Sequence, residues 1–374
     1  MSLLEAVREL GPRVREAAAD GERNRRLDPA LAKEFGSIGL WRASVPKSVG
    51  GLEIPFAQQL EAFEELARAD GAAGWCAMIG GTGSLVYAFL EPDVARALIA
   101  ADPDGCTGGV FAPQGRAVPK DGGLQVSGRW SFGSGVNHSA RMGFGVVVEG
   151  EIPDIRGVLL DAADFEIVDT WHVSGLRGTG SHDLEVQRLH VPAERVYRMF
   201  GGQPPHEGPL YRFPLFGLLG ACVASVCLGI ARSAIDELTA LAAGKTPAFA
   251  RRRLADRSHV QMQIALAEAE LRSARSLLFE VVADAWQGAE AGDAPTLQQR
   301  ALLRIASTNA ARASASAVDR MYDAGGGTSI YETSRLQRDF RDIHAATQHA
   351  VISQPTLEMA GRVLLGVEGD TAML

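Results

Sequence analysis

The sequence lacks the features by which several classes of protein are recognised. No basic run interrupts the 374 residues, and 37 Lys and Arg residues stand against 45 Asp and Glu residues, a net charge of −8. This acidic balance argues against a nucleic-acid partner. No GxGxxG turn follows a strand pattern, so the sequence predicts no nicotinamide-binding unit of its own. Tandem repeats and low-complexity tracts are also missing.

Cysteine is scarce and gives no sign of a metal site. Four cysteines are present, without CxxC spacing and without neighbouring histidines at zinc-type spacing: Cys76, Cys106, Cys222 and Cys227. Their apolar or glycine-rich surroundings predict buried free thiols in a reducing compartment. Residues 1–28 mix apolar and charged side chains in the pattern of an amphipathic helix, not of a signal peptide. We therefore expect a cytoplasmic protein without a bound metal.

One stretch lacks charge for long enough to suggest a membrane span. Leu215–Ala231 is uncharged throughout, but it is short for a span, contains three glycines and continues into an amphipathic helical pattern. A helix buried in a bundle accounts for this pattern better than a span does. The sequence therefore predicts no contact with a membrane.

Hydrophobic periodicity divides the chain into three regions, an α+β arrangement. Residues 1–105 predict an N-terminal helical domain, residues 106–208 a middle β barrel or sandwich of antiparallel strands, and residues 209–374 a helical bundle. The N-terminal helices are expected at Leu4–Ala19, at Ala30–Gly36, at Pro55–Ala69, around Trp75 and from Pro92. The C-terminal helices approach about thirty residues each, with a kink or break at Pro355: Leu215–Ala243, Val260–Gly288, Thr296–Ala324 and Leu336–Leu365.

Two glycine-rich segments of the β region are candidates for ligand binding. In Thr107–Ala117 and Gly128–Gly135, small residues would let a flat ligand lie against the strand backbone. Phe132 could cover the ligand, and Ser134 could form a hydrogen bond with it. Hairpin ends would produce the same glycine pattern.

A third segment, Trp171–Asp183, carries Arg177 beside a turn rich in Gly, Thr and Ser. A guanidinium and backbone amides suit an anionic or carbonyl-rich ligand. A surface turn with a solvated arginine is equally consistent with the pattern.

The segment Met321–His349 combines three consecutive glycines with an Arg/Asp-rich helical pattern and two histidines. Gly325–Gly327 would allow backbone to approach a ligand closely. The imidazole of His349 has an ordinary pKa suited to proton transfer near neutral pH, whereas His344 is expected to have a structural role.

These motifs together carry a family resemblance. GRWSFGSG, GLRGTGSHD, the triple glycine and RDFRDIHAATQH, in a chain ordered helical, β, helical, resemble the acyl-CoA dehydrogenase superfamily, and more closely its two-component flavin-dependent monooxygenases. The resemblance covers nearly the whole chain. It implies an acyl-CoA dehydrogenase-like fold with a C-terminal four-helix bundle and a homotetramer.

The resemblance also implies an activity. The chain would be the oxygenase component, taking reduced FMN or FAD from a separate flavin reductase. It would react with O2 through a C4a-hydroperoxyflavin and hydroxylate an apolar substrate that is aromatic or polycyclic.

In this family a Thr or Ser hydroxyl at the position of Ser134 is hydrogen-bonded to flavin N5, and the aromatic side chain at Phe132 flanks the flavin. Retention of the N5 proton would keep the hydroperoxide from expelling hydrogen peroxide. The resemblance further implies cofactor contacts from Phe111, Ala112 and Gly115 at the pyrimidine edge, from Arg177, and from Gly325, Gly326 and Gly327 of a neighbouring subunit at the phosphate-bearing tail.

The late helix distinguishes the two activities of the superfamily. The position of the dehydrogenases' catalytic Glu falls on Ala350, which cannot act as a base, and the monooxygenase histidine falls on His349. The resemblance thus implies acid–base catalysis or hydroperoxide stabilisation by His349, oriented by Asp342 from the same helix face. Two alternatives remain: an acyl-CoA dehydrogenase using a displaced Glu237 or Glu280, and a non-catalytic flavin-binding or scaffold subunit.

The substrate pocket departs from the pattern of several aromatic hydroxylases. Those enzymes carry a histidine soon after the motif that reads Gly74–Trp75 here, whereas the following stretch of this chain has none. Trp75, Thr82, Ser84 and Tyr87 remain as expected pocket residues. His138 could also reach the pocket, although a role at a strand end accounts for it better.

Overall fold

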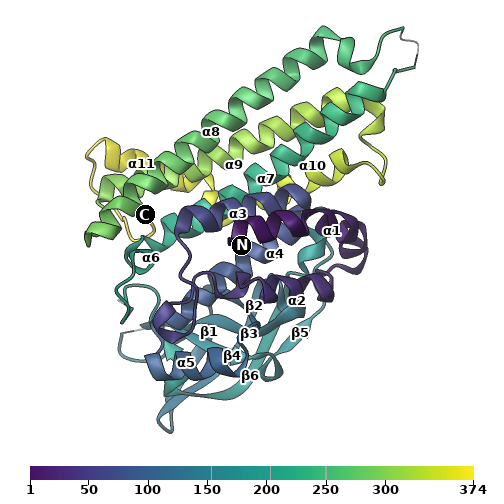
Figure 1. The fold of residues 1–374 in the computed structure, drawn as a ribbon. Helices are drawn as coiled ribbons and strands as arrows, with labels where there is room; N and C mark the ends of the chain where they lie inside the picture. Colours follow the sequence, from purple (N-terminus) through teal and green to yellow (C-terminus); the bar gives the residue numbers. More distant parts are fainter. Residues whose placement is uncertain (153, 203, 249–250) are drawn as a thin grey trace.

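The computed structural model describes residues 1–152, 154–202, 204–248 and 251–374, and it arranges them as helices, a sheet and a second set of helices (Figure 1). This order confirms the predicted fold class. The N-terminal helices lie where the periodicity places them: α1 (Leu3–Asn24), α2 (Pro29–Ser37), α3 (Phe56–Ala69), α4 (Gly71–Gly83) and α5 (Pro92–Ala101).

Helix α4 is buried along its length between α3, the C-terminal helices and the sheet. Asp70 caps its N-terminus by accepting a hydrogen bond of 2.9 Å from the Ala73 amide. A Cβ at Gly74 would lie 2.5 Å from the Ala67 backbone, and one at Gly83 would lie 2.1 Å from the Thr107 carbonyl oxygen. Glycine is therefore required at both ends of the helix, because any side chain would push α4 away from α3 or from the sheet.

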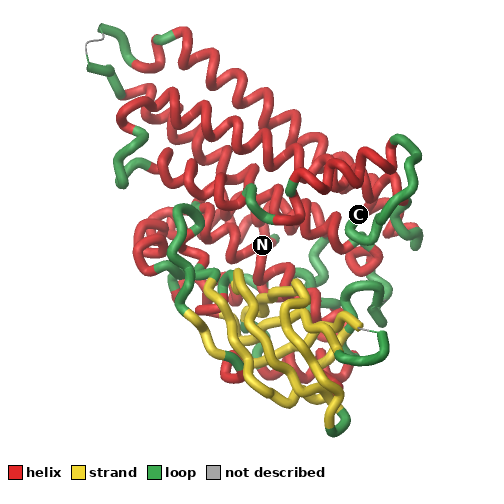
Figure 2. The backbone as a smooth tube through the Cα atoms, turned by 180° about the vertical axis from the view of Figure 1, so that it is seen from behind, coloured by secondary structure: helices red, strands yellow, loops and turns green. Residues whose placement is uncertain are grey.

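The middle region forms one seven-stranded sheet, drawn in yellow in Figure 2. Its order is β5-β6-β2-β1-β3-β4-β7, with these strands: β1 (Cys106–Lys120), β2 (Gly123–Gly133), β3 (Ser139–Val148), β4 (Asp154–Asp161), β5 (Glu166–Val168), β6 (His182–Pro192) and β7 (Val196–Tyr197). The expectation of purely antiparallel strands was wrong at one pair, since β1 and β3 are parallel. After the β1–β2 hairpin the chain crosses to the free edge of β1, so β3 enters in the direction of β1.

The C-terminal region contains three long helices that run side by side in both views, α7 (Leu215–Gly244), α8 (Ser258–Ala291) and α9 (Leu297–Gly325) (Figures 1 and 2). The short α6 (Pro209–Arg212) precedes them. Gly71–Phe89 and Leu215–Gly244 are both apolar enough to cross a membrane, but 89% and 78% of their apolar windows are buried inside the protein. Such burial is typical of core helices, as predicted for Leu215–Ala231.

The last predicted helix, Leu336–Leu365, is two helices: α10 (Arg335–Ala346) and α11 (Gln354–Leu364). A 3-10 turn at Ala350–Ile352 separates them. Pro355 explains the break, because a continuous helix would bring its ring against the carbonyl of Val351 and lose a hydrogen bond. His349 therefore lies in the link between the helices, and the prediction that it shares a helix face with Asp342 was wrong.

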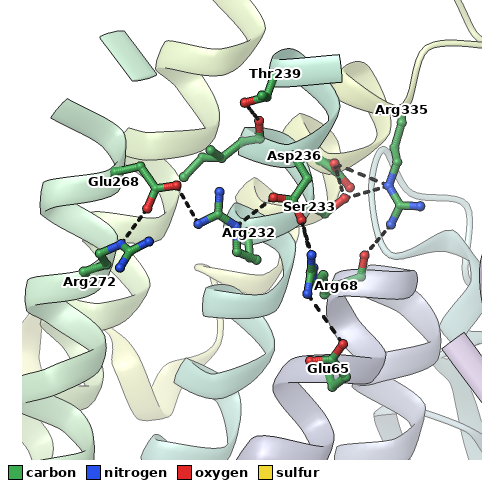
Figure 3. Close-up of polar contacts among 11 residues, drawn as sticks. Glu65, Arg68, Arg232, Ser233, Asp236, Thr239, Glu268, Arg272 and Arg335 are labelled. Atoms are coloured by element: carbon green, nitrogen blue, oxygen red, sulfur yellow. Dashed lines mark hydrogen bonds and ion pairs between the residues drawn. The ribbon is translucent and has the colours of Figure 1, made fainter. Parts of the chain in front are cut away.

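A seam of charged residues joins four of the helices (Figure 3). Arg232 of α7 contacts Glu268 of α8 at 2.8 Å, and Asp236 of α7 contacts Arg68 of α3 at 2.7 Å. Arg335 of α10 donates to the Arg68 carbonyl at 2.8 Å and to Ser233 Oγ at 2.6 Å. Most of these side chains are partly exposed, so their ion pairs add little to the free energy of folding. Their main effect is to fix the positions of the helices relative to one another.

Asp342 connects α10 to the loop that follows β5. Its Oδ1 accepts a 2.6 Å hydrogen bond from the Leu176 amide, and Arg341 donates to the Ser174 carbonyl at 2.5 Å. Burial, followed by the nearby charge of Asp70, raises the pKa of Asp342 to about 8. Asp342 thus anchors this loop rather than the ring of His349.

The raised pKa of Asp342 predicts a pH-dependent stability. A carboxyl whose folded-state pKa is raised stabilises the protein while it is protonated, and that contribution is lost as pH rises through the folded-state value. We expect Asp342→Asn, which keeps the acceptor for Leu176, to gain stability relative to wild type as the pH rises. The unfolding temperature of the variant minus that of wild type should increase by about 2–4 °C between pH 6 and pH 9. Thermal unfolding followed by circular dichroism measures this. Asp93→Asn, at a 95% exposed side chain, is the control, and a difference independent of pH would contradict the assignment.

Candidate functional site

Ser134 lies immediately after β2 and is buried at the centre of a hydrogen-bonded cluster. Its Oγ accepts a 3.1 Å hydrogen bond from Trp75 Nε1 and lies 2.7 Å from Ser181 Oγ. Ser181 Oγ lies 2.6 Å from Thr179 Oγ1, which donates at 2.8 Å to the Leu176 carbonyl.

The directions of these bonds follow from the number of protons. Thr179 has one hydroxyl proton, and the Leu176 carbonyl takes it, so Ser181 donates to Thr179. Ser181 has then used its own proton, so Ser134 donates to Ser181. With the Trp75 bond accepted, Ser134 Oγ keeps one lone pair. The cluster therefore presents an acceptor, suited to an N–H group of a ligand.

Trp75 also connects Ser134 to His349. The two rings have their centroids 5.7 Å apart and are tilted by 59°. The half-buried His349 ends the link after α10, where its Nδ1 accepts from the Val351 amide at 3.3 Å. Burial, with a smaller effect of the Arg304 charge, lowers the pKa of His349 to about 4. At neutral pH the imidazole is uncharged, and its proton is on Nε2.

The loop between β5 and β6 carries Arg177 in a 3-10 turn with Gly178 and Thr179. Leu176 before the turn has φ of 52°, a left-handed conformation that the hydrogen bond to Asp342 supports. The Nε atom of Arg177 is buried and has no hydrogen-bond partner among the described residues. A buried guanidinium nitrogen without a partner is a position at which a ligand can bind.

Phe132 combines two unusual features. Its φ is 69°, in the left-handed region that aromatic residues rarely adopt, and 68% of its surface is exposed. Its ring meets Trp171 edge-on, with centroids 6.2 Å apart. A strained backbone that holds an aromatic ring in solvent is typical of a residue that contacts a ligand.

Strand β1 becomes irregular at the predicted pyrimidine contacts. Its pairing with β3 jumps from Val110 opposite Phe144 to Pro113 opposite Gly145, so Phe111 and Ala112 fall outside the ladder. Their backbone groups are thereby available for a ligand. Gly115 is different, because it packs against Trp130, where a Cβ would lie 2.0 Å from the indole ring.

Three of the predicted pocket hydroxyls are engaged elsewhere. Ser84 Oγ donates to the Gly81 carbonyl at 2.7 Å. Thr82 Oγ1 donates to the Met78 carbonyl at 2.7 Å, within α4. The Tyr87 hydroxyl lies 2.9 Å from Thr107 Oγ1 and 3.2 Å from Arg141 Nη1. No hydrogen bond among the described residues joins any of these hydroxyls to Ser134 or His349.

His138 lies close to Ser134 in the chain but stacks on Trp41, with ring centroids 5.9 Å apart. Burial lowers its pKa to about 4, and its Nε2 has no partner among the described residues. His344, expected to be structural, lies 2.8 Å from Asp319 Oδ1.

The three glycines lie where α9 ends, with Gly326 at φ of 59°. The Gly325 carbonyl accepts from Lys245 Nζ at 2.7 Å, at the C-terminal end of α7. Gly326 and Gly327 are exposed, and a Cβ on either would meet nothing within 4 Å. Within the described residues no contact joins this turn to the Ser134 cluster.

The residues considered as a dehydrogenase's catalytic base have no contact with the cluster among the described residues. Ala350 holds the position after His349, Glu280 is exposed on α8, and Glu237 is half-buried on α7 without a contact to Trp75 or His349. The arrangement therefore favours chemistry by hydrogen bonds and a neutral imidazole over proton abstraction by a carboxylate.

Sequence reasoning missed Thr179, Ser181 and Arg304. The first two belong to the glycine-rich loop that the sequence singles out, but only the fold shows that they meet Ser134. Arg304 had a signal in the helical spacing, since Ala301, Thr308 and Ala311 place it on the buried face of α9.

Comparisons with known proteins identify the family of the chain. Residues 2–92 match the family model "Acyl-CoA dehydrogenase, N-terminal domain" and residues 221–354 match "Acyl-CoA dehydrogenase, C-terminal domain". The chain is 35% identical to the indole-3-acetate monooxygenase of Pseudomonas putida, over 95% of this chain and 92% of that protein. It is 29% identical to the flavin-dependent monooxygenase oxygenase subunit HsaA of Mycobacterium tuberculosis, over 93% and 91%.

A solved structure shares the whole fold. The 3-HSA hydroxylase from Rhodococcus sp. RHA1 aligns with a TM-score of 0.94 and 26% identity, over 100% of this chain and 99% of that one. The chain therefore belongs to the acyl-CoA dehydrogenase superfamily, in its branch of flavin-dependent monooxygenase oxygenase components.

Proposed function

We propose that the cluster of Ser134, Trp75 and His349 is the flavin and substrate site at which this oxygenase component hydroxylates an aromatic compound. One observation carries the proposal: the indole of Trp75 donates to Ser134 and contacts the ring of His349. A single side chain thus links the hydroxyl on the flavin side to the imidazole on the substrate side. Three relatives are named for indole-3-acetate, p-hydroxyphenylacetate and resorcinol. Each of these compounds contains an aromatic ring, which supports an aromatic substrate.

The residues around Ser134 suit a reduced flavin, which supplies the electrons and activates O2 when bound. Reduced flavin carries an N–H at N5, and Ser134 Oγ keeps one lone pair that can accept from it. Phe132 would cover the ring, the unpaired backbone at Phe111 and Ala112 would meet its pyrimidine edge, and Arg177 Nε would serve an oxygen of the cofactor. Gly115 would support this edge through its packing on Trp130.

The proposed role of His349 follows from its protonation state. A pKa of about 4 makes the resting imidazole a weak base. Its Nε2–H is a neutral hydrogen-bond donor, which can hold an oxygen atom on the substrate side. This favours stabilisation of that oxygen by a hydrogen bond over proton transfer by His349, including deprotonation of a phenol as the first step.

We further propose a homotetramer in the cytoplasm that receives reduced flavin from a separate reductase, and in which Gly325–Gly327 approach the flavin of a neighbouring subunit. Gly326 and Gly327 are exposed. Beside them Ile330 is 68% exposed and Tyr331 65%, an apolar surface that a neighbouring subunit would cover.

Replacement of His349 by Ala tests the substrate-side role. We expect hydroxylated product to form about 100-fold more slowly or worse, as for the loss of a preorganised hydrogen-bond donor to the reacting oxygen. Flavin affinity, measured by fluorescence quenching, should stay within about threefold, since the flavin contacts lie on the Ser134 side. His344→Ala is the matched control, because His344 pairs with Asp319 away from the cluster. Equal rates for His349→Ala and wild type would remove His349 from the mechanism.

Replacement of Ser134 by Ala tests the flavin-side role. The loss of one hydrogen bond is expected to raise the share of consumed O2 that leaves as hydrogen peroxide by about three- to tenfold. A peroxidase-coupled assay beside product analysis measures the share. Ser139→Ala is the control, because the buried hydroxyl of Ser139 donates to the Gly135 carbonyl outside the Ser134 cluster. This variant should leave the share of O2 released as peroxide unchanged. If Ser134→Ala and Ser139→Ala behave alike, the hydroxyl of Ser134 does not face the flavin.

A further inference from the structure

Arg304 is a fully buried cation on α9, with no exposed surface. Its Nη1 donates to the Phe216 carbonyl at 2.7 Å. Its Nε and Nη2 are buried without a hydrogen-bond partner, and no acidic side chain pairs with it among the described residues. Burial lowers the pKa of Arg304 to about 10, so the group keeps its charge at neutral pH. An uncompensated buried charge is strongly destabilising, which indicates that a ligand completes this position.

The free nitrogens share one edge of the guanidinium. The N–H bonds of Nε and Nη2 run parallel, which is the geometry that binds the two oxygens of a carboxylate side by side. The bond from Nη1 to Phe216 holds the opposite side of the group and so fixes its plane. Arg304 therefore presents a preformed fork for one carboxylate.

The position of Arg304 relates this fork to the proposed active site. Its positive charge contributes to the lowered pKa of His349, so the two groups are within electrostatic reach of each other. Gly220 of α7 leaves room beside the guanidinium, since a Cβ there would lie 3.0 Å from Nη1. Helix α9, which carries Arg304, also packs against the 3-10 turn Ala350–Ile352 that directly follows His349.

We propose, resting on the function proposed above, that Arg304 binds the carboxylate of the substrate, and that the substrates of this protein are aromatic acids. One buried guanidinium beside a neutral imidazole supplies one positive charge, which matches a carboxylate better than a phosphate dianion. The aromatic ring of such an acid would then lie toward His349 and Trp75. The names of the relatives do not distinguish acidic from neutral aromatic substrates, because they include two acids and the uncharged resorcinol.

Pairs of compounds that differ in the carboxylate test the proposal: indole-3-acetate with 3-methylindole, and 4-hydroxyphenylacetate with 4-methylphenol. In wild type we expect kcat/KM for the acid of at least one pair to exceed that for its neutral partner by about 30-fold or more, the strength of a paired charge-assisted bond. Arg304→Met should lower the value for the acid by about 100-fold and change the neutral compound by less than about threefold. Arg304→Lys keeps the charge without the fork, so its kcat/KM for the acid should lie between the values of wild type and Arg304→Met.

The controls separate binding from folding. Arg312→Met alters an exposed arginine of the same helix and should change neither compound. Because Met replaces an unpaired buried charge, the variant should unfold at a temperature no lower than wild type. If it does not fold, Arg304→Gln keeps a donor for Phe216 and serves the same comparison. Equal losses for acid and neutral compounds would reduce Arg304 to a structural residue and overturn the proposal.

Ligand binding without turnover distinguishes this proposal from the proposed function. The acid should raise the unfolding temperature of wild type, and not of Arg304→Met, in the absence of flavin and reductase. Such a shift without hydroxylation of any compound would contradict the function and retain the carboxylate site. Riboflavin and FMN give the remaining comparison: if Arg304→Met abolishes a preference for FMN, the fork binds the cofactor phosphate, and the substrate assignment is wrong.

Discussion

The close packing of α4 is the constraint on which the site depends. This helix is buried against α3, α7 and β1, and it can lie there only because its ends are glycine, at Gly74 beside Ala67 and at Gly83 beside Thr107. Trp75 follows Gly74 directly, so the contact that fixes the helix also fixes the indole. From that position one ring reaches Ser134 of the sheet region and His349 of the C-terminal region. Three distant parts of the chain thereby meet at one side chain.

The positions of the hydroxyl and imidazole protons in the site are fixed by their hydrogen-bond partners and by burial. The Leu176 carbonyl directs the hydroxyl protons of Thr179, Ser181 and Ser134 in one sense and leaves an acceptor at its end. Burial keeps His349 uncharged at neutral pH, with its proton on Nε2. The same loop is held by Asp342, whose raised pKa reflects its burial. A dry site with fixed donors and acceptors suits a reaction in which the cofactor activates the oxygen and the protein controls where protons go.

Local patterns predict the elements well and the contacts between them poorly. The long helices and the β region follow from hydrophobic period, and Ser134, Phe132, Arg177 and His349 follow from glycine-rich motifs and resemblance. The helix break before His349 could not be placed, because the effect of Pro355 reaches back several residues and the sequence does not say how far. The partners of Ser134 lie 59 and 47 residues away, so no spacing rule connects them. Thr82 and Tyr87 illustrate the converse, since hydroxyls near a motif can be satisfied by their own surroundings.

The most direct test of the account is a single turnover with labelled oxygen. The protein is mixed with chemically reduced flavin, an aromatic acid and 18O2, without any reductase, and the product is analysed by mass spectrometry. Oxygenation at this site predicts a hydroxylated product that carries one 18O atom. The reductase can be left out because it supplies only the reduced flavin. A product whose new oxygen comes from water, or peroxide release as the sole outcome with every aromatic compound tried, would contradict it.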